Sequence, residues 1–198
     1  DHVALPRRIG AATGGVSTAL FHAPSAGAPG PTAEGARHVS FFAVRGKALG
    51  ARPEAVAALA ELMEEVALTP RLDSRERVLE IAREQHARVE AGLRSQGNAL
   101  GASRIASTVS LDGWVSDQTG GLAYAEAARR IRDAAEAPEA WPGLLRQLQD
   151  LHRRIVASGD VVINLTGDEG VVAAAEEPLV ARLAAAFGTR ADGGALVG

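Results

Sequence analysis

The sequence predicts an α+β fold, with an antiparallel or mixed β-sheet covered on one face by a block of helices. Short apolar runs typical of strands occur at 16–21, 37–44 and 161–166. The long stretch 52–157 instead shows apolar residues at helical spacing, divided by glycines and prolines. Strands, then a run of helices, then a strand and a last helix are typical of helices layered on a sheet.

The strand 37–44 and the helix 52–68 form the segment around which the rest is expected to fold. Alternate strand residues are apolar on both faces, with Val39, Phe41 and Ala43 on one and Ser40, Phe42 and Val44 on the other. This pattern favours a central strand covered on both sides. The helix, with Pro53 in its first turn, carries one apolar stripe (Val56, Leu59, Ala60, Met63, Val66, Ala67).

Two glycines precede the strand at 16–21. Gly14 and Gly15 permit a bulge or a close approach of the backbone there. A phosphate-binding loop is the alternative, but no Lys-Ser/Thr pair follows, and a strand rather than a helix comes next. The Pro/Gly/Ser-rich segment 23–36 is predicted to be a flexible loop at the tip of a hairpin.

Further helices are predicted along the rest of the chain. Asp73 or Ser74 caps a long helix that ends at Gly97-Asn98. A loop containing Trp114 is expected at 111–118, and Pro178 is expected to divide the last helix into two pieces. The remaining predictions are helices at 98–109, 122–135, 140–157 and 168–187 and a loose tail at 188–198.

Composition limits the classes of function. The 198 residues suit one domain, predicted over 1–198, and the core must be built from Ala, Leu and Val because only 4% of residues are aromatic. A net charge of −3 argues against nucleic-acid and membrane partners. No apolar run is long enough to span a bilayer, and no leader peptide is recognisable, so a cytoplasmic location is expected. The absence of cysteine excludes disulfides and thiolate metal sites.

Few residues suggest chemistry. His86 and Glu90 are four residues apart on a helix, with Glu84 nearby, but such pairs are more often solvated than metal-bound. Lys47, the only lysine, is more simply a residue of a sheet edge or a turn than a Schiff-base or phosphate residue. The segment Asp112–Asp117 with Trp114 is either a binding loop or a packed crossing. We therefore predict no catalytic, cofactor-binding or metal-binding residue.

Four short motifs follow one another in a telling order. They are Thr13-Gly-Gly-Val-Ser, Gly46-Lys-Ala-Leu, the segment 95–107 (Ser-Gln-Gly-Asn-Ala-Leu-Gly-Ala-Ser-Arg-Ile-Ala-Ser) and Gly120-Gly-Leu. Together they resemble the third domain of presequence-protease-type zinc metallopeptidases, in the insulinase/pitrilysin superfamily. The resemblance covers about 9–187. Gly97 and Arg104 keep their places in the family pattern, whereas Asn98 stands where the family often has His.

The resemblance implies a non-catalytic role. In such enzymes four related domains enclose a peptide chamber, the zinc site (His-x-x-Glu-His) lies in the first domain, and the third is catalytically silent. No family catalytic residue can be carried onto this sequence, and no His-x-x-Glu-His motif occurs in it. The implied partners are the other domains of the same peptidase and its peptide substrate, and zinc would be held by another domain.

The resemblance also implies that the chain is a piece of a longer protein. Such domains begin with a further strand and helix ahead of the first motif, so some apolar surface of the sheet is expected to be exposed or covered by a partner. A stand-alone α+β interaction or oligomerisation module is the alternative, because the chemistry is so sparse. A catalytic enzyme acting alone, with His86 as its best site, comes third.

Overall fold

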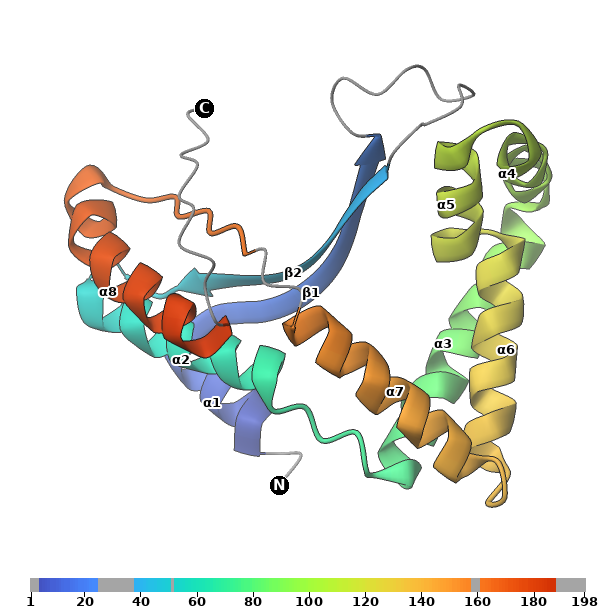
Figure 1. Ribbon diagram of the computed structural model, residues 1–198, viewed down its shortest axis with the longest axis horizontal. Coiled ribbons are helices and arrows are strands. Elements are labelled where there is room, and N and C mark those ends of the chain that lie inside the picture. The colour runs from blue at the N-terminus through green and yellow to red at the C-terminus, as the bar shows by residue number, and fades with distance from the viewer. Residues whose placement is uncertain (1–3, 25–37, 51, 158–160, 188–198) are drawn as a thin grey trace. The chain divides into compact units, whose positions relative to one another are not determined.

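The computed structural model describes residues 4–24, 38–50, 52–157 and 161–187. These residues confirm the α+β class, with helices and one sheet of two antiparallel strands (Figure 1). The chain divides into two compact units. The described parts of 1–19, 42–70 and 151–198 form the first, and those of 20–41 and 71–150 form the second.

The first unit is centred on helix α2 (Pro53–Leu68). Helices α1 (Ala4–Ala12) and α8 (Glu169–Phe187) flank it, as Figure 1 shows. The strands are β1 (Thr13–Pro24) and β2 (His38–Ala48), and they continue from this unit into the second. The buried apolar side chains of the unit are Val56, Leu59, Ala60, Leu62 and Ala175.

Ion pairs join the outer helices of this unit to α2. Arg182 on α8 donates to Glu64 at 2.5 Å and to Glu61 at 3.3 Å, and the hydrogen bond to Glu64 raises the pKa of Arg182 above its ordinary value. Arg8 on α1 donates to Glu65 at 2.7 Å. The acidic residues on α2 thus bind both neighbouring helices.

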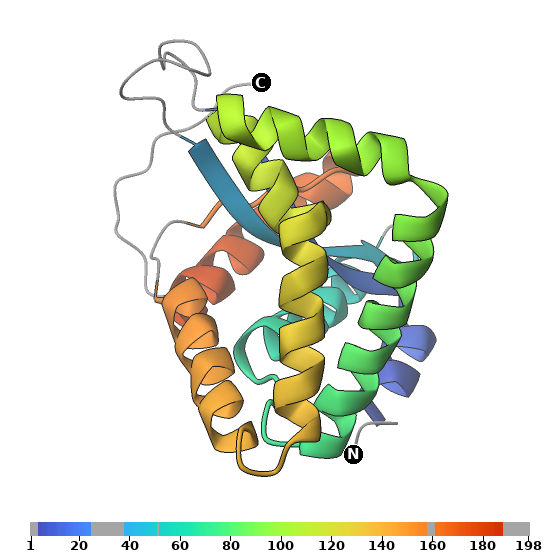
Figure 2. The ribbon, with the colours of Figure 1, turned by 90° about the vertical axis from the view of Figure 1, so that its right-hand side faces the viewer.

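The second unit is a group of helices built largely from small residues. Helices α3 (Arg75–Ser95) and α6 (Leu122–Glu136) lie side by side in Figures 1 and 2. Arg75 donates from Nε to the carbonyl oxygen of Ala135 at 2.9 Å and from Nη2 to that of Glu136. It thereby pairs carbonyl groups that the end of α6 leaves without helical partners. The buried apolar residues here are Ala82, Ala128, Ala135 and Leu144.

The other helices of the second unit are α4 (Gly97–Val109), α5 (Leu111–Gly120) and α7 (Trp141–Val156), and α7 leads the chain back into the first unit. The predicted loop at 111–118 is therefore wrong. Ser110 accepts the backbone N–H of Gly113 at 3.0 Å and caps α5. This cap and the tertiary contacts of α5 outweigh the low helix propensity of its Asp, Gly and Ser residues.

Three further predictions differ from the structure. Residues 161–166 form no strand, because they exchange no ladder of hydrogen bonds with β1 or β2. Helix α8 continues through Pro178, since Ala-rich sequence on both sides favours helix despite the missing N–H. The helix at 75 ends at Ser95, before the predicted Gly97, which instead begins α4.

The expectation of a central strand covered on both faces is also wrong. Phe41 is 49% exposed and Phe42 is 48% exposed, although they point to opposite faces of β2. The described sheet contains β1 and β2 alone, so it has no central strand. Most of the predicted loop 23–36, and the whole predicted tail 188–198, lie outside the described residues.

Candidate functional site

The first sequence motif forms the junction between α1 and β1. Thr13 is buried, donates its hydroxyl to the carbonyl oxygen of Ile9 at 2.7 Å, and accepts the N–H of Gly15 at 3.1 Å. Gly15 has φ +118°, a conformation that favours glycine. A Cβ atom on Gly14 would lie 3.3 Å from Cδ of Lys47, which explains the expected close approach. The pair of glycines therefore has a structural explanation.

The second motif brings β2 onto α2. A Cβ atom on Gly46 would lie 2.6 Å from Cδ1 of Leu59 and 2.9 Å from Sδ of Met63. Glycine therefore lets the strand approach the helix closely. Lys47 is exposed, and its aliphatic stem lies beside Gly14. Lys47 lies in β2, an edge strand of the two-stranded described sheet, which fits the interpretation of Lys47 as an edge residue.

The third and fourth motifs meet at a single buried carboxylate. Asp117, on α5, has a fully buried side chain. One of its oxygens accepts from Nη1 of Arg104 on α4 at 2.7 Å, and the other accepts the N–H of Leu122, the first residue of α6, at 2.9 Å. Asp117 therefore ties three successive helices together and caps the N-terminus of α6.

Two glycines allow these helices to approach. A Cβ atom on Gly113 would lie 2.4 Å from the carbonyl oxygen of Ala106, and one on Gly121 would lie 2.3 Å from Oδ1 of Asp117. A heavier side chain at either position has to displace the backbone or the buried carboxylate. The motif residues Arg104 and Gly121 therefore share one structural function, which is to support Asp117.

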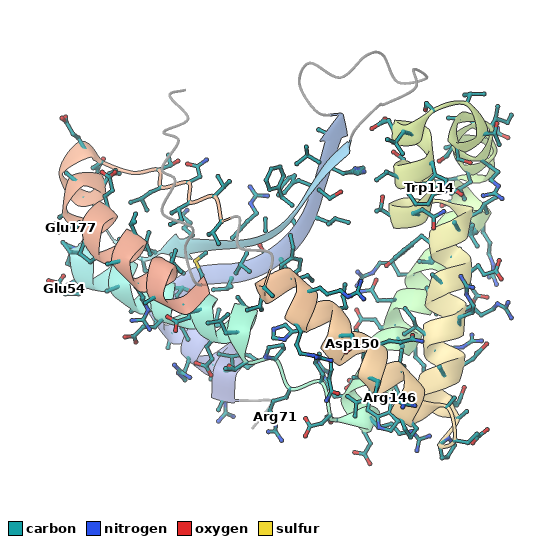
Figure 3. The ribbon with its side chains drawn as sticks, in the orientation of Figure 1. Glu54, Arg71, Trp114, Arg146, Asp150 and Glu177 are labelled. Carbon is teal, nitrogen blue, oxygen red and sulfur yellow. The ribbon has the colours of Figure 1, made fainter. Side chains whose placement is uncertain are left out.

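An open groove lies beside this carboxylate, on the surface formed by α4, α5 and α6. Its volume is about 650 Å³. It is lined by Arg104, Ser107 and Thr108 of α4, Trp114 and Gln118 of α5, and Leu122, Ala123, Glu126 and Arg130 of α6. Figure 3 labels Trp114, which lies on α5 and is 51% exposed. We call this feature the α4–α6 groove, and it is the candidate functional site of the described chain.

The weak metal candidate has a different environment from that of a metal site. Nδ1 of His86 lies 3.9 Å from Glu90, while Nη1 of Arg132 lies 3.1 Å from Nδ1 and 3.2 Å from Nε2 of the same ring. An adjacent guanidinium disfavours a divalent cation. Within 4–24, 38–50, 52–157 and 161–187, no three His, Asp or Glu side chains are grouped so that they could hold a metal ion. The resemblance assigns zinc to another domain, and the described residues offer no group that fits it.

The chain belongs to the family described as "Peptidase M-16C associated", which it matches over residues 1–131. This confirms the resemblance to presequence-protease-type metallopeptidases of the insulinase family. The chain is also 28% identical, over 167 residues, to presequence protease 1, chloroplastic/mitochondrial, of Arabidopsis thaliana. That alignment covers 84% of this chain but only 14% of the length of the plant protein.

No helix in the described part of the chain is both long enough and apolar enough to cross a membrane. The name of the plant relative places that protein in chloroplasts and mitochondria, which does not confirm the predicted cytoplasmic location.

Sequence reasoning missed Asp117, the residue on which the third and fourth motifs converge. Asp117 belongs to the segment with two open interpretations. The segment is helical and the carboxylate of Asp117 is buried, as in a packed crossing, but Trp114 is half exposed and does not anchor it. No sequence signal pointed to this role, because Asp117 precedes Leu122 by five residues, whereas an N-cap residue lies directly before its helix. The α4–α6 groove had no sequence signal either, because its lining comes from three helices.

Proposed function

We propose that this chain is a non-catalytic domain of a zinc metallopeptidase that degrades peptides in a closed chamber. In this proposal its two units act as one domain that forms part of the chamber wall and contacts the other domains. The single observation that carries the proposal is the family match over 1–131. The alignment with a small part of a much longer presequence protease supports it, because it leaves room for separate catalytic domains in the same polypeptide.

We assign interdomain contact to the far end of the hairpin, by which we mean the last residues of β1 and the first residues of β2. The apolar side chains Leu20, Phe21, Val39 and Phe41 are all at least one-third exposed there. Exposed apolar side chains on neighbouring strands are typical of surfaces that pack against a partner. In this proposal another domain of the peptidase covers them.

The test compares the intact gene product with the 198-residue chain. Phe41→Ser and Leu20→Ser remove apolar surface at the far end of the hairpin, and Leu151→Ser is a control on α7 that is similarly exposed. We expect the two hairpin variants to lower the melting temperature and the rate of peptide hydrolysis of the intact product. The isolated chain should change little, because these side chains are already half in water.

Two results would count against this assignment. Equal destabilisation of the intact product and the isolated chain would mean that the hairpin packs on its own chain. No effect on either, or the same effect from Leu151→Ser, would remove the hairpin as an interdomain surface.

A further inference from the structure

We infer that the α4–α6 groove binds a peptide segment in which an acidic side chain lies next to an apolar one. The inference does not rest on the proposed function, because it uses only the residues that line the groove and is tested on this chain alone.

The two arginines of the groove, Arg104 and Arg130, differ in whether an acidic residue of the protein already pairs with them. Arg104 is 58% exposed, and one of its five donors, on Nη1, is taken by Asp117. Its other donors make no hydrogen bond to another described residue. The pairing with Asp117 fixes the guanidinium before any ligand arrives, which lowers the entropy cost of binding.

Arg130 supplies the charge that is not balanced within the protein. Among the described residues it has no hydrogen bond and no ion pair. Glu126, the one acidic residue of the lining, lies 3.7 Å from Arg129, whose charge opposes its own. Because Asp117 offsets Arg104 and Glu126 offsets Arg129, the positive charge of Arg130 remains for an anion. Arginine binds carboxylates in a two-pronged geometry, which makes an acidic side chain a suitable partner.

The hydroxyl groups of the groove favour a peptide over a phosphate. Ser107 donates to the carbonyl oxygen of Arg104 at 2.7 Å, and Thr108 donates to that of Ile105 at 2.7 Å. Each hydroxyl has therefore used its only proton and offers acceptor lone pairs to a ligand. A phosphate requires donors, whereas the N–H groups of a peptide backbone require acceptors. Gln118 can both donate and accept.

An apolar surface lies beside these polar groups. Trp114 and Leu122 are both at least 40% exposed and line the same groove. A half-exposed tryptophan is the kind of side chain that dominates the energy of peptide contacts. Small-molecule sites are more enclosed and more apolar than this groove, so an extended segment that lays side chains into it fits better.

The test uses fluorescence anisotropy with the full chain. The probe is a fluorescein-labelled octapeptide with two aspartates alternating with two leucines between Gly-Ser ends. A matched peptide carries lysines in place of the aspartates. We expect saturable binding of the acidic probe with a Kd on the order of 0.1 mM, weakened by added salt because the charges are exposed. The lysine peptide should bind at least about tenfold more weakly.

Variants separate the groove from the general charge of the protein. Arg130→Gln should weaken binding about fivefold, and Trp114→Ala about tenfold. Arg94→Gln, at an exposed position of α3 outside the groove lining, makes the same change in net charge and should leave the Kd within about twofold. Far-UV circular dichroism checks folding. If Trp114→Ala does not fold, Arg130→Glu replaces it and should weaken binding at least about tenfold, because it places a like charge against the ligand.

Three outcomes would overturn the inference. No saturable binding of the acidic probe would remove the site, and an equal effect of Arg94→Gln would reduce it to overall charge. Inorganic phosphate that competes as well as the unlabelled acidic peptide would show an anion site without peptide recognition.

Discussion

The buried carboxylate of Asp117 allows the sharpest prediction about stability. Its two hydrogen bonds, at 2.7 Å to Arg104 and 2.9 Å to Leu122 N–H, have different functions. The first neutralises a charge that has no exposure to water, and the second caps α6. If this is correct, the cost of removing Arg104 depends on whether residue 117 is charged.

The magnitudes follow from burial. Arg104→Ala leaves a buried carboxylate without its cation, a change that costs about 3–5 kcal/mol when both partners are buried, and about 2 kcal/mol here because the Arg104 side chain is 58% exposed. In an Asp117→Asn background the same change should cost less than about 0.5 kcal/mol, because a neutral amide needs no counterion. Asp117→Asn alone should cost about 2 kcal/mol. Its oxygen can still accept the N–H of Leu122, but its NH₂ group faces the guanidinium of Arg104, which leaves a buried donor without an acceptor.

Urea unfolding followed by circular dichroism in the far ultraviolet measures all four proteins of this cycle. Arg88→Ala is the matched control, since Arg88 pairs with Glu84 at 2.8 Å with both side chains well exposed, and should cost at most about 0.5 kcal/mol. The reasoning is refuted if Arg104→Ala costs the same in both backgrounds. That result would mean that Arg104 contributes only its packing.

Four other substitutions test the space around three glycines and the cap at the end of α6. Gly113→Ala should lower the free energy of unfolding by about 2–3 kcal/mol, because its Cβ would lie 2.4 Å from the carbonyl oxygen of Ala106. Gly101→Ala on α4 is the control: with open space around it, the change should stabilise the protein by up to about 1 kcal/mol. Gly46→Ala should cost about 1–2 kcal/mol by pushing β2 off α2, and a value near zero would mean that the side chains of α2 simply move aside. Arg75→Ala should cost about 1–3 kcal/mol and expose the last amides of α6 to hydrogen exchange, and unchanged exchange there would contradict its capping role.

The sequence predicted most helix positions correctly because their local signals agree with the fold. Pro53 in the first turn of α2 and Gly121 before α6 are signals of this kind. The sequence did not predict helix α5, because Asp117 and Gly113 are poor helix formers. Both residues contribute instead through contacts with neighbouring helices. The exposure of Phe41 was missed because alternation shows which residues share a face but not whether anything covers it.

The groove could not be predicted for a related reason. Its lining comes from three helices, and the distance between helices depends on which residues lie at their crossings. Glycine at 113 permits the close crossing of α4 and α5, but the sequence alone does not identify Ala106 as the residue it meets. The absence of a catalytic or metal residue from this chain stays a prediction.

The mass and zinc content of the intact gene product, measured on one sample by mass spectrometry, test the central proposal most directly. The proposal predicts a polypeptide several times larger than the 20.4 kDa chain, with about one zinc ion per polypeptide bound outside the described residues. A gene product of 20.4 kDa without zinc would contradict it, because no catalytic domain would then share the polypeptide.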